Sequence, residues 1–143
     1  MSFDYKTYSL KEHFDNFNQQ YWNGTLPSGP LCWIKDANNM VARAHAQFDF
    51  HKDSRCWRIK ILIPTATSKD WVSGHLLHEM IHLQLKDDPT EQSDNPHFHG
   101  AKFKARAAEL KQLTGYENIE DVHVRAEQMI PCFQELMRRQ SLK

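Results

Sequence analysis

The pattern H-E-x-x-H occurs once in this chain, as His78-Glu79-Met80-Ile81-His82, and it constrains the fold more than any other feature. Histidines four positions apart on a helix are separated by about 40° around the axis and by one turn along it, so both imidazoles can reach one metal ion. Glu79 is then placed to take a proton from a water molecule at that metal. The pattern therefore predicts a helix that holds two metal ligands and a general base.

The residues around this pattern predict that the helix is buried. Apolar side chains cover most of its circumference, whereas one narrow polar sector contains His75, His78, Glu79 and His82. A polar stripe on a buried helix must be paired or must coordinate an ion. Metal binding is therefore favoured over the alternative, in which the histidines only form hydrogen bonds to the backbone.

The ends of this helix are marked by capping residues and prolines. Thr67, with Asp70 three residues later, resembles a capping box in which Asp replaces the usual Glu. Pro89 requires the helix to have ended by about Asp87. We expect a helix between these limits.

A catalytic zinc site needs a third protein ligand and one open position, and the chain offers three candidates for that ligand. His99 is favoured, because a helical stripe of apolar residues at positions 103–110 follows it and would pack against the first ligand helix. His97 precedes that stripe. Glu109 is the third candidate, because some zinc sites of this type take their third ligand from a glutamate on a later helix.

The order of helix and strand patterns predicts an α+β fold. Apolar residues at helical spacing predict a first helix over residues 9–22. Apolar or alternating segments predict strands at residues 31–35, 41–50 and 57–63. Because the segments between them are short, we expect an antiparallel meander and thus a three-stranded, mainly antiparallel sheet. The H-E-x-x-H helix, a second ligand-bearing helix ending at Gly115, and C-terminal helices within residues 119–139 complete a small zincin-type domain.

These residues resemble the SprT-like domain, the zinc protease module found in Spartan-type proteins. The resemblance rests on Leu76–His82, on His99–Phe103 as a version of an H-G-x-x-F element, and on Tyr21-Trp22 with Leu26-Pro27. It covers roughly residues 9–115. The chain has Ala101 and Lys102 where Pro and Glu are common in the family, and it lacks the cysteine-rich zinc ribbon of many bacterial members.

Membership of this family would imply a zinc metallopeptidase that acts on proteins or peptides, including proteins associated with DNA. The zinc ligands would be His78, His82 and His99, and Glu79 would be the catalytic acid and base. The alternative is a non-catalytic SprT-like module that keeps the zinc and docks a nucleic acid or a protein partner. An intact Glu79 favours the enzyme, because docking does not require a carboxylate at that position.

Length, charge and cysteine content predict one small domain. The chain has 143 residues, which we divide into a core at about 9–115 and a helical extension over 116–143. Lys plus Arg and Asp plus Glu both total 18, so no overall field draws the protein to DNA or to acidic membranes. The three cysteines form no C-x-x-C pair, which indicates reduced, intracellular thiols. With no signal-peptide or membrane-spanning pattern, we expect a cytoplasmic protein without a membrane partner.

Charged clusters and further polar residues flank the predicted site. The acidic loop contains Asp87, Asp88, Glu91 and Asp94, and the basic side of the second ligand helix contains Lys102, Lys104, Arg106 and Lys111. We interpret both as solvated surfaces. The alternatives for the acidic loop are a lip that attracts basic peptides and a carboxylate that orients a ligand histidine. The alternative for the basic side is a weak, salt-sensitive contact with nucleic acid. The candidates for stabilising an oxyanion are Tyr116, His97 and His75.

Overall fold

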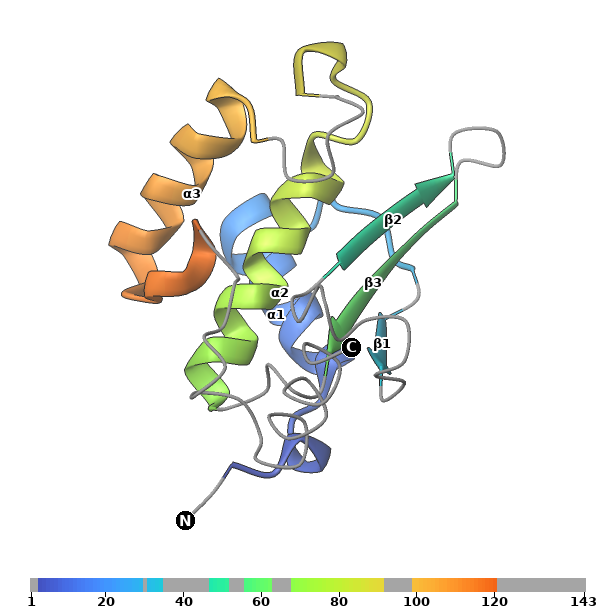
Figure 1. Cartoon of the computed structure of the whole chain (residues 1–143), viewed down its shortest axis with the longest axis vertical. Coiled ribbons are helices and arrows are strands. Elements are labelled where there is room, and N and C mark those ends of the chain that lie inside the picture. The colour runs from blue at the N-terminus through green and yellow to red at the C-terminus, as the bar shows by residue number, and fades with distance from the viewer. Residues whose placement is uncertain are drawn as a thin grey trace, which may run out of the picture.

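The computed structural model describes residues 3–29, 31–34, 47–51, 56–62, 68–91 and 99–120, and the fold is given for these residues. Its helices are α1 (Leu10–Trp22), α2 (Lys69–Gln84) and α3 (Ala101–Thr114), and its strands are β1 (Leu31–Ile34), β2 (Gln47–His51) and β3 (Cys56–Leu62). Short 3-10 helices occur at η1 (Tyr5–Thr7), η4 (Pro89–Glu91) and η5 (Glu117–Ile119). The described part of the chain is thus an α+β fold (Figure 1).

The strands form a mixed sheet in the order β1-β3-β2. β1 runs parallel to β3, with Leu31 opposite Ile59, and β2 runs antiparallel to β3, with Phe48 opposite Ile59. The predicted antiparallel meander is therefore wrong. Residues 35–55, which include β2, connect the parallel strands β1 and β3, and this connection is longer than the dozen or so residues that a parallel pair requires.

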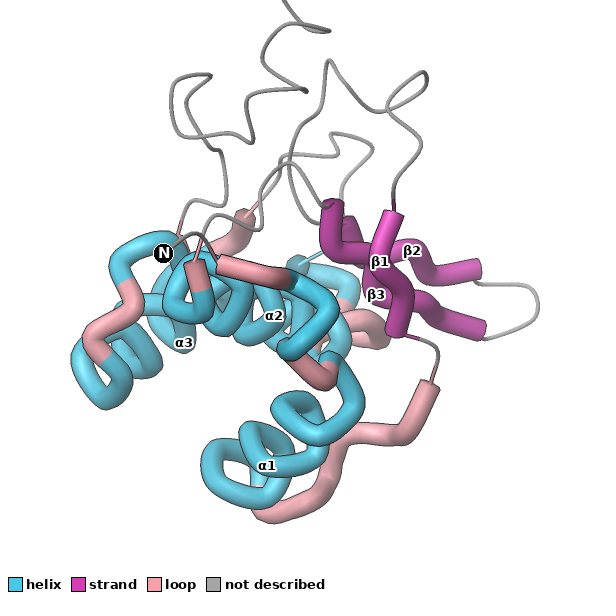
Figure 2. Tube along the Cα trace, turned by 90° about the horizontal axis from the view of Figure 1, so that it is seen from below, coloured by secondary structure: helices cyan, strands magenta, loops and turns pink. Residues whose placement is uncertain are grey.

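Helix α2 is at the centre of the fold. Both views place it between α3 on one side and the sheet on the other (Figures 1 and 2). Every residue from Val72 to Ile81 is buried, which confirms the predicted buried helix. Its N-cap is Ser68 rather than Thr67, since the Ser68 hydroxyl accepts the hydrogen bond from the Trp71 backbone N–H.

Helix α1 begins and ends where the sequence predicts. The side chain of Ser9 caps its N-terminus by accepting from Glu12 N–H. Asn23 ends it in the left-handed region, at φ 52°. The indole N–H of Trp22, its last residue, donates to the side chain of Gln84 at 2.7 Å, which joins the C-terminal ends of α1 and α2.

Several sequence predictions lie outside the described residues. These are residues 41–46 of the second predicted strand, His97, and the C-terminal helices beyond residue 120. Ile119, the expected start of those helices, is the last residue of η5. Within the described ranges, no helix has the length and apolar character that crossing a bilayer requires.

Candidate metal centre

Three histidine side chains converge beside the middle of α2. His78 and His82 come from successive turns of α2, and His99 lies just before the first residue of α3. One ring nitrogen from each lies within 4.8 Å of one from each of the others. The three ring centroids are 4.8 to 5.2 Å apart. Among the described residues, these three side chains form a group that could hold one metal ion.

A backbone carbonyl from η5 fixes the orientation of His78. Nδ1 of His78 lies 2.6 Å from the carbonyl oxygen of Ile119, which can only accept, so we assign the ring proton to Nδ1. Nε2 is then the nitrogen with a lone pair for a metal. A hydrogen bond of this kind fixes the tautomer and the ring direction of a metal-binding histidine. The sequence contains no signal for it, because Ile119 is 41 residues away.

Burial keeps the imidazoles of His78 and His82 neutral, which is the state that metal binding needs. Desolvation, and then the neighbouring ring of His82, hold the pKa of His78 well below its usual value. Desolvation, followed by the influence of His99, lowers the pKa of His82 to about 3. Neutral imidazoles without a thiolate are a donor set that suits zinc.

Glu79 places a carboxylate beside this group. Its side chain is buried, and Oε1 lies 4.0 Å from Nε2 of His78, the nitrogen that is directed away from Ile119. A buried carboxylate at this position could exchange a proton with a water molecule held near the three histidines. The structure therefore places the side chain of Glu79 beside the ring of His78, and its role as a base stays a prediction.

The ring of Phe103 forms one wall of the histidine group. It stacks on His99 with ring centroids 4.2 Å apart and an interplanar angle of 8°. The same ring lies 4.5 Å from the ring of His82 and 4.8 Å from that of His78. From the sequence, Phe103 was expected only to pack in the core; the structure adds that it contacts all three imidazoles.

Asn118 anchors η5, and hence Ile119, to the first half of α2. Its side-chain amide donates to the carbonyl oxygen of Trp71 at 2.8 Å. Its Oδ1 fills the space that a side chain at Gly74 would need, because an ideal Cβ there would lie 1.8 Å away. The isolated glycine inside the α2 pattern was the sequence signal for this close approach.

Among the described residues, Glu109 is not part of this group. The side chain of Glu109 is largely exposed and forms an ion pair with Arg106. His75 is fully buried and makes an edge-to-face contact with Trp71. Tyr116, another candidate for stabilising an oxyanion, is half-buried at the start of η5.

The charged clusters on either side of the site are partly paired with each other. Lys102 forms an ion pair with Asp88 of the acidic loop. The guanidinium of Arg106 lies over the ring of Trp22, 5.0 Å from its centroid, and donates to the carbonyl oxygen of Tyr21. Two members of the predicted basic side of α3 therefore have partners within the protein.

The fold and the geometry are those of a domain with a three-histidine site and an adjacent buried glutamate on two packed helices. The model of the SprT-like family matches residues 10–124, and the chain belongs to this family. No curated protein gives a significant match. The family is associated with zinc metallopeptidase-like domains, which agrees with a site that could bind a metal.

Proposed function

We propose that this protein is a zinc-dependent metallopeptidase, with His78, His82 and His99 as zinc ligands and Glu79 as the general base. The donor set supports this assignment, because the imidazoles of the three histidines would hold a zinc ion and would leave one position for a water molecule. Catalytic zinc sites have such an open position, whereas structural sites usually have four protein ligands.

The chemistry divides between the metal and Glu79. When bound, zinc supplies Lewis acidity toward the substrate carbonyl and the attacking water. Glu79 takes the proton from that water and delivers it to the departing amine, so one carboxylate serves as base and then as acid. His78 is held in one tautomer by Ile119, and Phe103 limits the movement of the other two rings.

The observation that most supports catalysis is the buried carboxylate of Glu79, 4.0 Å from Nε2 of His78. A carboxylate at this position can take a proton from a water molecule held beside the three histidines. A module that used zinc only for stability or for docking would have no need for this group beside the histidines.

We propose a protein or peptide as the substrate. Recognition of nucleic acid through α3 has less support, because Lys102 and Arg106 are engaged by Asp88 and Trp22. Action on DNA-associated proteins is compatible with the family, but in this chain it would have to depend on contacts other than a continuous basic face on α3.

The test replaces Glu79 with glutamine, which preserves size and hydrogen bonding but cannot accept the proton. Zinc content and thermal stability of Glu79→Gln should match the wild type. Cleavage of an unstructured protein such as casein should fall at least about a hundredfold. The matched control is Gln84→Glu, which places a carboxylate at the exposed end of the same helix and should cleave normally. An unchanged rate in Glu79→Gln would refute the mechanism.

A further inference from the structure

Helix α3, which begins directly after the His99-Gly100 pair, has no capping side chain of its own. Its N-cap is Gly100, and no side chain at that position can accept from the first free N–H groups. α1 and α2 differ in this respect, because Ser9 and Ser68 cap them locally. The helix that follows His99 therefore depends on an acceptor from elsewhere.

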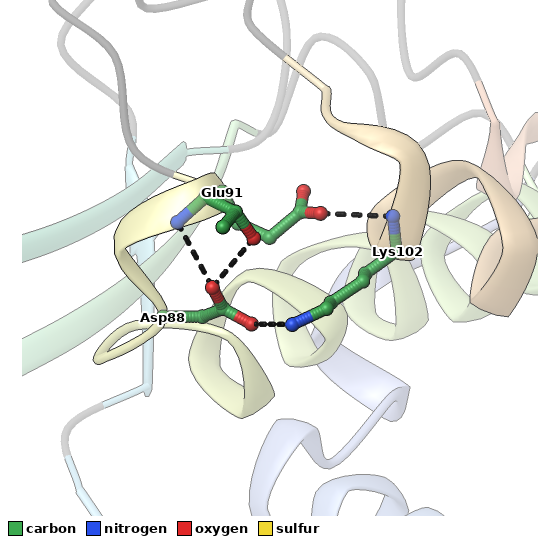
Figure 3. Close-up of polar contacts among 4 residues, drawn as sticks. Asp88, Glu91 and Lys102 are labelled. Carbon is green, nitrogen blue, oxygen red and sulfur yellow. Dashed lines mark hydrogen bonds and ion pairs between the residues drawn. The ribbon is translucent and has the colours of Figure 1, made fainter.

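Glu91, the last residue of η4, supplies that acceptor from eleven residues earlier in the chain. Its Oε1 accepts from the backbone N–H of Lys102 at 2.8 Å, as Figure 3 shows. Its Oε2 lies against Gly100, where an ideal Cβ would be only 2.2 Å away. The carboxylate thus occupies the space left by the missing side chain of Gly100. A negative charge here also interacts favourably with the positive end of the helix dipole.

Oε2 of Glu91 is buried and accepts no hydrogen bond from any of the residues that the structure describes. Such an oxygen is costly, so its position calls for a physical reason. The position of this oxygen against Gly100 suggests the reason. Gly100 directly follows His99, so a carboxylate held there would fix the backbone from which the His99 side chain extends.

A second contact holds the same loop against α3. Asp88 forms an ion pair with the ammonium group of Lys102 and accepts from both the N–H and the hydroxyl of Thr90 (Figure 3). The ammonium group of Lys102 and the two hydrogen bonds from Thr90 lower the pKa of Asp88 to about 2, so its carboxylate stays charged. The loop that leaves α2 is therefore attached to the first turn of α3 at two points.

We propose that Glu91 is a positioning residue of the metal centre, which holds the start of α3 so that His99 meets His78 and His82. This inference rests on the proposed zinc site and deepens it. Among the described residues, Glu91 is not a member of the three-histidine group; its carboxylate acts through Lys102 N–H and through the space over Gly100. Gly100 is required at its position because any larger residue would displace the carboxylate.

The first experiment measures metal binding by Glu91 variants of the full chain. The dissociation constant for zinc is measured by chelator competition, and the visible spectrum of the cobalt(II) form reports the ligand geometry. Glu91→Ala should raise the dissociation constant about tenfold or more, within the range for residues that orient metal ligands, and should change the cobalt spectrum. Glu91→Gln keeps the acceptor for Lys102 N–H and should restore most of the affinity. Glu12→Ala, at an acidic residue in the first turn of α1, is the control and should bind as the wild type does.

The second experiment combines Glu91 with Gly100 in a double-mutant cycle. Gly100 has φ −78° and ψ −177°, which alanine adopts without strain, so the cost of Gly100→Ala should come from the contact with Glu91. Gly100→Ala alone should weaken zinc binding. In the Glu91→Ala background the same change should have almost no further effect, because the obstructing carboxylate is gone.

The outcomes separate this inference from the proposed function. A wild type that binds zinc, with a Glu91→Ala variant of equal affinity and identical cobalt spectrum, would overturn the inference alone. Equal effects of Gly100→Ala in the two backgrounds would also overturn it. A folded wild type that binds neither zinc nor cobalt would overturn the proposed function and the inference together.

Discussion

The ring of Phe103 lies parallel to the imidazole of His99, 4.2 Å from it between centroids, four residues along the same stretch of chain. The residues that lead into α3 therefore contribute a candidate ligand, and the first turn of α3 contributes the surface on which that ligand rests. The stacked ring restricts the rotation of the His99 side chain. Less side-chain entropy is therefore lost when His99 binds a metal. The interval between His99 and Phe103 has a physical role beyond helix packing.

Replacing Phe103 should weaken zinc binding by more than the accompanying loss of protein stability would explain. Phe103→Leu keeps an apolar side chain but removes the stacked ring, with an expected stability loss of about 1 kcal/mol. Zinc affinity should fall several-fold. Phe14→Leu, on α1 and equally buried at 2% exposure, should lose comparable stability and retain full affinity. Equal zinc dissociation constants for the two variants would contradict a role for the ring in the site.

Metal content should distinguish His99 from the other two candidates for the third ligand. A four-ligand structural zinc site is worth roughly 10–16 kcal/mol, so one ligand accounts for on the order of 3 kcal/mol, or about a hundredfold in affinity. His99→Ala should weaken zinc binding by about this factor. Glu109→Ala removes only an exposed ion pair with Arg106, and His97→Ala removes a residue outside the ligand set that we propose. Both variants should therefore keep the zinc content of the wild type, measured by atomic absorption. An empty site in either variant would exclude the proposed ligand set.

Gly74 should reverse the usual effect of alanine in a helix. Gly→Ala inside a helix normally stabilises it by about 1 kcal/mol. At Gly74 the new Cβ would collide with Asn118, and we expect a loss of about 1–3 kcal/mol in thermal unfolding. In the Asn118→Ala background the collision is absent, so Gly74→Ala should be neutral or stabilising. The same sign in both backgrounds would show that Asn118 does not approach Gly74 as described.

Any binding of nucleic acid by α3 should depend on Lys104 and Lys111, two exposed members of its basic side, because the exposed Lys102 is paired with Asp88. Reversing both charges should flatten the salt dependence of DNA binding by about one unit per lost phosphate contact, with thermal stability unchanged. Arg106→Glu should instead destabilise the protein, because Arg106 contacts Trp22 and Tyr21. Tight binding that survives charge reversal would place the interface elsewhere.

Local patterns predicted the helices more accurately than the sheet. The ends of α1 follow from Ser9 and Asn23, which act within a few residues of where they occur. The pairing of β1 with β3 instead depends on the path of the chain between strands, and local alternation contains no information about that path. The length of chain between the first and third strands was the available signal, since it is long enough for the connection that a parallel pair requires.

In the candidate site, too, local features could be predicted from the sequence and contacts between distant segments could not. The convergence of His78 and His82 follows from helix geometry, and the helical stripe after His99 favoured it over its two competitors. The contacts from Glu91 and Ile119 could not be predicted, because each depends on how separate segments pack. Glycine was the indirect clue in two places, where a polar side chain fills the space of an absent Cβ.

The hydrogen bond from His78 to Ile119 also affects where this domain can be shortened. A protein trimmed after Gly115 would retain Glu79 and all three histidines, and by motif content it would look intact. It would nevertheless lack the carbonyl that selects the tautomer of His78 and the amide of Asn118 that anchors it. We therefore expect the smallest unit that keeps the histidine group in this arrangement to end no earlier than residue 119, past the boundary near 115 that the sequence resemblance indicates.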